Sequence, residues 1–160
     1  MSEEWRVIPG ATRYRVSSLG RVESRARKEP RILKACPARG GYVRVGITDD
    51  HGLLRYRMVH VLVLEAFIGP RPDLECRHLN GNPADNRLDN LAWGTRSQNN
   101  LDRVRHGTHQ HAAQTHCKWG HEFTPDNTYV YTYKNGRKTR MCRTCRRKRF
   151  LEFQARKATA

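Results

Sequence analysis

One histidine and two asparagines stand at intervals that could assemble a single hydrolytic site. His78 closes an apolar run, Asn90 follows twelve residues later, and Asn99 follows nine residues after that. A neutral imidazole, with an ordinary pKa of about 6.5, can take a proton from water at neutral pH. A side-chain amide can hydrogen-bond a loop, or offer its carbonyl oxygen to a hard divalent cation. Water activation and charge neutralisation together are what hydrolysis of a phosphodiester requires.

A strand, a loop and a helix would have to position these three side chains. His78 stands at the end of the expected strand, and an Asn-Gly turn follows it. Asn90, on the returning segment, is placed to hydrogen-bond the backbone of the histidine loop and so fix the imidazole. Thr95 is a favourable N-cap for an amphipathic helix over residues 96–105, which would carry Asn99.

Each of these residues also has a plainer interpretation. An isolated His-Leu-Asn-Gly is most often a hairpin turn with a surface histidine, and only its register with Asn90 and Asn99 argues otherwise. His60 lies on a short apolar helix, where a packed structural histidine is more common than a ligand. Trp93 is expected to fill the small core. Cys36 and Cys76 are taken as free thiols without a function.

Residues 74–107 resemble the HNH endonuclease family, most closely the group carried by phages and by self-splicing introns as homing endonucleases. Residues 4–24 are similar to the small module that commonly precedes the nuclease in this group. The resemblance implies a ββα-metal (His-Me finger) core with His78 as general base, Asn90 as loop organiser and Asn99 as ligand of Mg²⁺ or another divalent cation. The matching pieces are residues 60–67, 78–82, 85–91, 93–95, Asn99 and 103–108.

Arg77 departs from the family pattern. Close relatives often have a metal-binding aspartate just before the catalytic histidine, and an arginine cannot bind a cation. The metal would then rest on Asn99, waters and substrate phosphates, or Asp85 or His60 would substitute. Arg77 could instead clamp a phosphate. The alternative function is a non-catalytic DNA-binding protein that retains the HNH fold.

A second cluster of metal-binding residues lies nearer the C-terminus. Cys117 and His121 form one close pair, and Cys142 and Cys145 form another. Three cysteines and one histidine make a common closed structural zinc site. A fragment of this size cannot bury enough apolar surface to fold alone, so we expect Zn²⁺ to hold it together. His116 is the competing fourth ligand, and a cysteine pair without metal is the plainer alternative.

Between the two ligand pairs, residues 128–133 alternate as a strand, and Asn135-Gly136 predicts a hairpin turn. This pattern favours a small zinc ribbon or a treble-clef-like unit. The last ligand runs into a basic, helix-prone tail. Residues expected to contact DNA, mainly through its phosphates, are Arg77, Arg96, Arg143, Arg146, Arg147, Lys148 and Arg149.

The composition of the chain favours a polyanionic partner. The formal net charge is +16, and residues 101–160 carry 14 Lys and Arg against 4 Asp and Glu. Double-stranded DNA is the expected partner; an RNA-binding zinc protein is a third interpretation, without a recognised RNA module to support it. No apolar run is long enough to span a membrane, and the polar, acidic N-terminus does not read as a secretory signal. We therefore expect an intracellular protein, in the host cytoplasm if a phage encodes it.

The sequence predicts an α+β protein built from small pieces. Only 37% of its residues are hydrophobic and its mean hydropathy is −0.86, which argues against one large core. The expected organisation is a β-rich module over residues 1–50, the HNH core over 51–108, a linker over 109–116, and a zinc-binding unit with its basic tail over 117–160.

Overall fold

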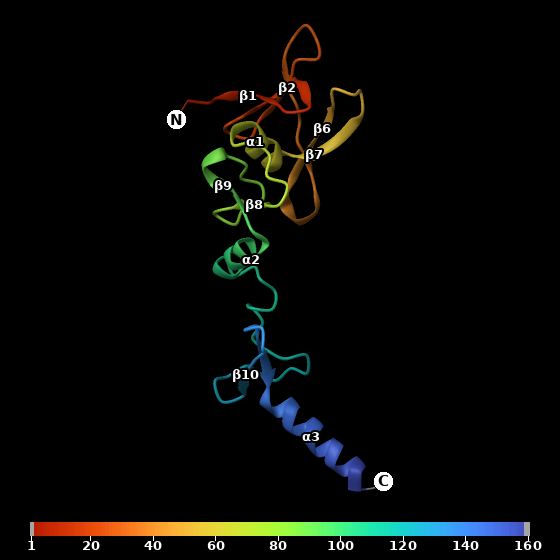
Figure 1. The fold of residues 1–160 in the computed structure, drawn as a ribbon, viewed down its shortest axis with the longest axis vertical. Coiled ribbons are helices and arrows are strands. Elements are labelled where there is room, and N and C mark those ends of the chain that lie inside the picture. The colour runs from red at the N-terminus through yellow and green to blue at the C-terminus, as the bar shows by residue number, and fades with distance from the viewer. Residues whose placement is uncertain (1, 159–160) are drawn as a thin grey trace. The chain divides into compact units, whose positions relative to one another are not determined.

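The structure is a computed structural model of the chain and describes residues 2–158. The chain forms two compact units, which divide between His109 and Gln110 (Figure 1). In the described residues, the first unit holds three small sheets, two α-helices and two short 3₁₀ helices, and the second holds one hairpin and one long helix. The α+β fold class expected from the sequence is confirmed.

A four-stranded antiparallel sheet opens the first unit. Along β2 the side chains of Tyr14 and Val16 are buried, whereas Arg13 is exposed and Arg15 is half-buried, which is the alternation of a strand with one face on the core. The strands lie in the order β1-β2-β3-β4 and are β1 (Trp5–Ile8), β2 (Ala11–Ser17), β3 (Val22–Ser24) and β4 (Arg31–Ile32).

A three-stranded antiparallel sheet follows. Val45 and Ile47 on its central strand are almost fully buried, whereas Gly46 between them is half-buried. Its strands, in spatial order, are β5 (Cys36–Pro37), β6 (Val43–Thr48) and β7 (Leu54–Met58), with the short 3₁₀ helix η1 (Arg39–Gly41) between β5 and β6. The turn between β6 and β7 has the sequence Asp-Asp-His-Gly over residues 49–52, and Asp and Gly are residue types that favour turns.

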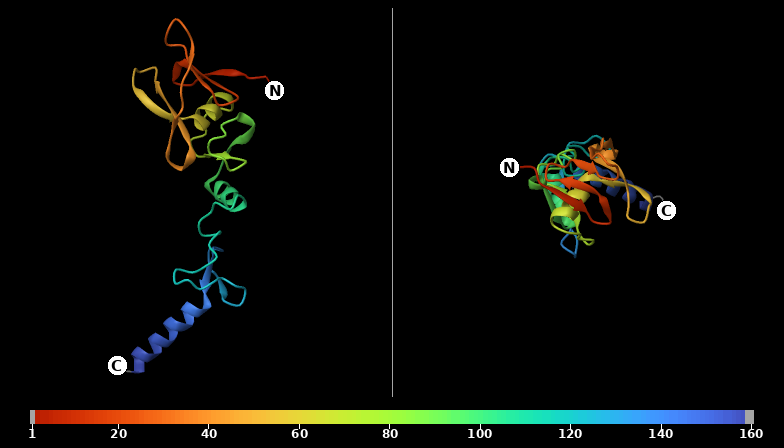
Figure 2. Two further views of the ribbon diagram at one scale, coloured as in Figure 1. Left: turned by 180° about the vertical axis from the view of Figure 1, so that it is seen from behind. Right: turned by 90° about the horizontal axis from the view of Figure 1, so that it is seen from above.

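The short helix α1 (Val59–Phe67) forms the centre of the first unit. It contacts strands from each of the unit's three sheets, and both views place it among them (Figures 1 and 2). Leu62, Val63 and Leu64 on this helix have no exposed surface. The helix ends where the amides of Ile68 and Gly69 both donate to the carbonyl oxygen of Leu64. Because α1 is buried, the residues around it are held in fixed positions.

The ββα segment comes next in the chain. It consists of the antiparallel pair β8 (Glu75–His78) and β9 (Leu91–Gly94), the 3₁₀ helix η2 (Leu88–Asn90) between them, and α2 (Arg96–Arg105). Thr95 caps α2 through its hydroxyl, which accepts from the Gln98 amide, while the Gln98 side chain accepts from the Thr95 amide. The strand, loop and helix expected around His78 are therefore present.

All three sheets share one apolar core. It combines Val16 from β2 with Leu62 from α1, and Leu91 from β9 completes it. The regions expected as separate modules, 1–50 and 51–108, accordingly lie in one compact unit. The buried apolar residues are Ile8, Ala11, Tyr14, Val16, Val22, Val45, Ile47, Val59, Leu62, Val63, Leu64 and Leu91.

The second unit consists of an antiparallel hairpin, β10 (Thr128–Thr132) and β11 (Lys138–Cys142), followed directly by α3 (Arg143–Ala158) (Figure 2). Among the residues that the structure describes in this unit, Cys142 is the one buried hydrophobic side chain. The segment expected as a linker, 109–116, is instead largely bound to this unit, because the Arg140 guanidinium donates to carbonyl oxygens within it. Within residues 2–158 no helix is both long and apolar enough to cross a membrane.

Candidate active site and metal centre

His78 ends β8 with its side chain buried, and one nitrogen of its ring is fixed. Its Nε2 lies 3.3 Å from Oδ1 of Asn86, while Nδ2 of Asn86 donates to the carbonyl oxygen of Ala84 at 3.1 Å. The Ala84 contact requires the amide nitrogen of Asn86 on that side, so its oxygen faces the imidazole. The arrangement selects the tautomer with hydrogen on Nε2 and leaves the lone pair on Nδ1.

Asn90 connects the two sides of the loop that follows His78. Its Oδ1 accepts from the backbone amide of Asn80 at 2.9 Å, and its Nδ2 donates to the backbone carbonyl of Asp85 at 2.8 Å. The Asn90 backbone adds a third link, because its carbonyl accepts from the amide of Leu79 at 2.8 Å. The side chain is buried, so these hydrogen bonds are shielded from water.

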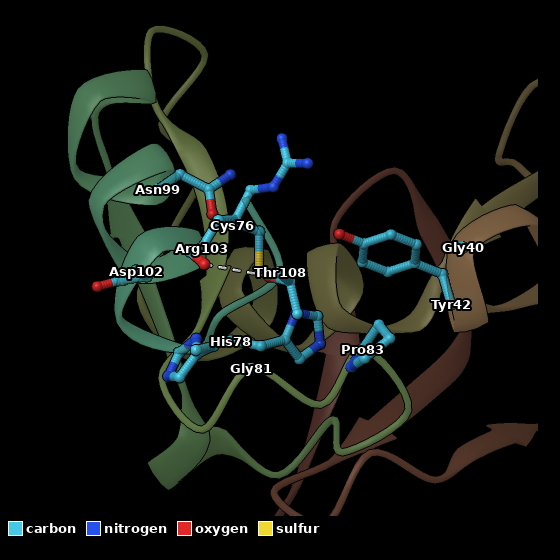
Figure 3. A pocket seen from close by; sticks show the side chains of 11 residues that line it. Gly40, Tyr42, Cys76, His78, Gly81, Pro83, Asn99, Asp102, Arg103 and Thr108 are labelled. Carbon is cyan, nitrogen blue, oxygen red and sulfur yellow. Dashed lines mark hydrogen bonds between the residues drawn. The ribbon is translucent and has the colours of Figure 1, made fainter. Parts of the chain in front are cut away.

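Asn99 lies on α2, one turn after the N-cap. Its Nδ2 donates to Oε2 of Glu75 on β8 at 2.8 Å, which leaves the carboxamide oxygen for another partner. Asn99 and His78 line the same cavity, of about 390 Å³. In Figure 3 they come from different elements, with Cys76 between them and Tyr42 facing them across the cavity.

Arg77 has a partner within the protein. Its guanidinium donates from Nε to Asp102 on α2 at 2.7 Å, and a second nitrogen lies 2.6 Å from the same carboxylate oxygen. Both side chains are mostly buried, with 16% and 9% of their surface exposed. The pair fastens β8 to α2. Arg77 and Asp102 therefore largely neutralise each other's charge.

Three rings pack together beside the cavity. The imidazole of His60 lies 5.0 Å from that of His78 in an edge-to-face arrangement and 5.1 Å from the ring of Tyr42, measured between centroids. Among the buried side-chain polar atoms that the structure describes, Nδ1 of His60 is the one without a hydrogen-bond partner. His60 is thus a packed histidine of α1 in direct contact with the expected base.

Both histidines are held in the neutral form. Burial lowers the pKa of His78 below its ordinary value, although the hydrogen bond with Asn86 and the charge of Asp85 act in the opposite direction. Burial, with a smaller contribution from the neighbouring His78, lowers the pKa of His60 to about 4. Arg87 lowers the pKa of the Asp85 carboxyl, so Asp85 stays negatively charged beside the histidine loop.

The N-terminal sheet touches the loop that carries Asn86. The backbone carbonyl of Ser18 accepts from the amide of Leu88 at 2.8 Å. Gly20 has a positive φ of 80°, and a Cβ atom there would lie 2.9 Å from the backbone oxygen of Asn86. Only a glycine permits this approach without a shift of one of the two segments. The position of Asn86, and through it the imidazole, therefore depends on a turn some sixty residues earlier.

The cavity offers few ligands for a hard divalent cation. Asp102 is the one carboxylate among its described lining residues, and Arg77 already holds it. Asp85, the expected substitute, is not among the lining residues, so the expected oxygen ligand that does line the cavity is the carboxamide of Asn99. Mg²⁺ commonly keeps several waters and shares substrate phosphate oxygens. This donor set therefore fits a cation that the substrate helps to hold, and not one bound firmly by the protein alone.

The second unit brings four soft ligands together. The ligand atoms of Cys117, His121, Cys142 and Cys145 all lie within 4.8 Å of one another. The sulfurs of Cys117 and Cys145 are 3.7 Å apart, and each lies within 3.4 Å of Nδ1 of His121. Ligands at about 2.3 Å around a tetrahedral Zn²⁺ would be separated by about 3.8 Å. The Cys₃His set is therefore compatible with structural zinc.

The competing ligand His116 is not in this cluster. Its Nδ1 is 2.9 Å from the hydroxyl of Thr115, and its ring is exposed. The amide of Cys145 donates toward the sulfur of Cys142 and, as the largest cause, lowers the pKa of that thiol to about 6. This favours the thiolate form that binds metal.

The basic residues expected to contact DNA lie in several places. Arg96 is exposed at the start of α2, and those of the C-terminal run are exposed along α3. Arg143 and Arg146 both extend over the ring of Tyr129, at 5.7 and 4.6 Å from its centroid. Arg77 alone in the expected set has a buried ion-pair partner.

Sequence reasoning missed Asn86 and Tyr42. Asn86 is one of four asparagines between residues 80 and 90, and nothing in the sequence separates the one that faces the imidazole from those that shape turns. Its one signal is the Asp-Asn-Arg run shared with the family resemblance. Tyr42 precedes β6 and reaches the cavity through folding alone.

The first unit of the chain is similar to known protein families. Residues 57–101 match the family model described as HNH endonuclease, and residues 3–48 match the NUMOD4 motif. A protein of Acanthamoeba polyphaga mimivirus, named Uncharacterized HNH endonuclease L247, is 34% identical over 103 residues, or 61% of this chain. The match spans 25% of that protein, so this chain corresponds to about a quarter of its length.

A solved structure is also similar. It is described as DNA binding and cleavage by the HNH homing endonuclease I-HmuI, and it matches with a TM-score of 0.58 and 25% sequence identity. The match covers 93% of this chain and 83% of the solved one.

Proposed function

Because the chain carries an HNH endonuclease domain over residues 57–101, behind a NUMOD4 motif, we propose that it cuts double-stranded DNA in a metal-dependent hydrolysis. The observation that carries this proposal is the shared cavity, in which a neutral imidazole and a side-chain amide face the same space. The similarity to a mimivirus protein and to a homing endonuclease supports an origin in a phage or another mobile element.

In this proposal His78 is the general base. Its Nδ1 carries the lone pair, since Asn86 accepts from the opposite nitrogen, and it takes a proton from the water that attacks phosphorus. The resulting imidazolium is stabilised by the Asn86 oxygen and by the negative charge of Asp85. Asn90 acts as loop organiser through its two backbone contacts and touches no reacting atom.

Asn99 is the proposed ligand of the divalent cation, through the oxygen that its contact with Glu75 leaves available. A bound Mg²⁺ would neutralise charge on the scissile phosphate and on the departing 3′ oxygen. Cleavage then leaves a 5′ phosphate and a 3′ hydroxyl. Zn²⁺ in the Cys₃His cluster is proposed to be structural, and the exposed basic residues to contact phosphates.

Cleavage of supercoiled plasmid with Mg²⁺ or Mn²⁺ tests this assignment. We expect His78→Ala to lose roughly 10²–10⁴-fold in rate, the usual contribution of a general base, while its affinity for DNA is retained. His51→Ala is the matched control, because His51 is exposed in the turn between β6 and β7. Equal cleavage by the wild type and His78→Ala would remove His78 from the mechanism.

A second candidate function is a DNA-binding protein without catalysis. The buried ion pair between Arg77 and Asp102 favours it, because this pair occupies the one carboxylate that lines the cavity. This candidate predicts DNA binding that weakens steeply with salt, and no cleavage with any divalent metal. The plasmid assay, repeated over a series of metals, separates the two functions.

A further inference from the structure

Trp119 presents its indole to solvent at the tip of the turn between the first two zinc-ligand residues. The residue is 65% exposed, although an indole has a large apolar surface that is usually buried. Its backbone is fixed, since its amide donates to the sulfur of Cys117 at 3.4 Å and the Gly120 amide donates to the Cys117 carbonyl at 3.0 Å. The exposure therefore follows from the folded turn and not from a loose loop.

Two hollows flank this indole. The larger, of about 480 Å³, and the smaller, of about 460 Å³, share Trp119, Cys145 and Arg149 in their walls. The larger hollow has two more aromatic side chains, Phe123 and Tyr133. Either hollow is large enough to admit a small planar ligand beside the indole.

The walls of the hollows are positively charged. The larger one contains Lys118 and Arg149 and no acidic residue among its described lining, and the smaller adds Lys148 with Glu152 as its one acid. Arg140 belongs to the same wall, but its guanidinium is engaged by backbone carbonyls within residues 111–114. An exposed aromatic face bordered by cations suits a ligand that combines a flat ring with negative charge.

We propose that Trp119 stacks on an unpaired base of single-stranded nucleic acid, while Arg149 contacts its phosphates. The Lys118 ammonium lies over the indole ring, 5.4 Å from its centroid, and adds positive charge beside it. The inference deepens the proposed DNA-cutting function and rests on it for the identity of the polymer. In an intact duplex the faces of the bases are covered by their neighbours, so a duplex would use the basic residues and gain little from the indole. A separated strand exposes those faces, and base–aromatic stacking contributes roughly 1–3 kcal/mol per base.

The test measures binding of the zinc-loaded, full-length protein to a fluorescent oligothymidylate and to a duplex of the same length. We expect Trp119→Ala to weaken single-strand binding by about 5- to 150-fold, the equivalent of one lost stack, and duplex binding by less than about twofold. Trp119→Phe should retain most of the affinity. Phe153→Ala is the matched control, because Phe153 is an aromatic residue of α3 that is 55% exposed and lines neither hollow.

Salt dependence separates stacking from charge in the same experiment. Trp119→Ala should leave the slope of log K against log salt unchanged, whereas Arg149→Gln should reduce it by about 0.7, the value for one phosphate contact on a single strand. Zinc content is measured for each variant. If Trp119→Ala loses zinc, Trp119→Leu takes its place, since it keeps an apolar side chain but has no ring to stack; single-strand affinity equal to that of Trp119→Phe would overturn the inference.

Three results would overturn the inference. They are equal losses on single strand and duplex, no loss on either, and a change in sedimentation of the free protein with unaltered oligonucleotide binding, which would assign the indole to a contact between copies. Plasmid cleavage by the wild type is scored separately. A protein that binds oligothymidylate through Trp119 but cuts no plasmid would refute the proposed nuclease and keep the single-strand site.

Discussion

Different interactions stabilise the fold of each of the two units. In the first, twelve buried apolar side chains of the described residues form one core, four of them on α1 itself, and this core holds the elements that carry His78 and Asn90. The helix that carries Asn99, α2, is attached to β8 through the ion pair of Arg77 with Asp102. In the second, Cys142 is the one buried hydrophobic side chain among the described residues, and it belongs to the Cys₃His cluster. Apolar packing therefore positions His78 and Asn90, whereas the basic helix of the second unit would be positioned by the proposed Zn²⁺. Four changes test this contrast.

Loss of zinc should have the largest effect, confined to the second unit. The double variant Cys142→Ser, Cys145→Ser is expected to lose its metal ion and with it about 10–16 kcal/mol of apparent folding free energy. Hydrogen exchange should then show unprotected amides in β10 and β11 and unchanged protection in α1. Cys36→Ser, an exposed cysteine of the first unit, is the control. Unaltered zinc content in the double variant would refute the site.

Removing side-chain volume from the apolar core should destabilise the first unit and leave the second unit unchanged. Leu64 on α1 is fully buried, so Leu64→Ala is expected to destabilise the first unit by about 2–5 kcal/mol. Thermal unfolding followed by calorimetry should show one transition shifted to lower temperature, with zinc content unchanged. Loss of zinc together with this shift would mean that the two units do not fold independently.

Acid should destabilise the first unit through His60. Its pKa is about 4 in the folded state and about 6.5 when unfolded, so between these values the unfolded chain binds more protons and stability falls as pH falls. The loss contributed by this one group is up to about 3 kcal/mol. We expect His60→Phe to remove that part of the loss, as measured by urea unfolding at about pH 7.5 and about pH 5. An identical pH dependence in both proteins would contradict the assignment.

Asn86→Leu should damage catalysis more than stability. Without the acceptor at Nε2 the imidazole is free to turn or change tautomer, and misplacement of this kind costs about 100-fold in rate, or roughly 2.7 kcal/mol. Asn86→Asp keeps an acceptor, and its charge should raise the pKa of His78, so the acid limb of the pH–rate profile should move to higher pH. Unchanged profiles for both variants would assign Asn86 a packing role only.

Local patterns in the sequence were sufficient to predict the ββα segment. The intervals between His78, Asn90 and Asn99 along the chain indicated a strand, a loop and a helix. Thr95 and Gln98, three residues apart, form a capping box, which is a local sequence pattern. The helix over 59–67 and the hairpin around Asn135-Gly136 were likewise predictable, because apolar periodicity and turn residues determine them locally. The Cys₃His cluster followed from ligand spacing.

Contacts between distant segments could not be predicted in this way. Arg77 meets Asp102 twenty-five residues later, and this pairing leaves little of its charge for a phosphate. The contact of Tyr42 with His60 and His78 depends on how two sheets pack around α1. A single sequence does not show which residues that are far apart in the chain come into contact. The assignments of Arg77 to DNA contact and of Asn99 to the cation remain predictions.

The close approach of Gly20 to Asn86 has an evolutionary consequence. Proteins assembled from a leading module and a cutting module could in principle exchange the first to reach new targets while leaving the second intact. Here the two parts meet at a point where a single methyl group would not fit. A leading module from another protein could replace the present one only if it also had a glycine in the turn that contacts Asn86. The junction therefore limits which exchanges yield a working hybrid.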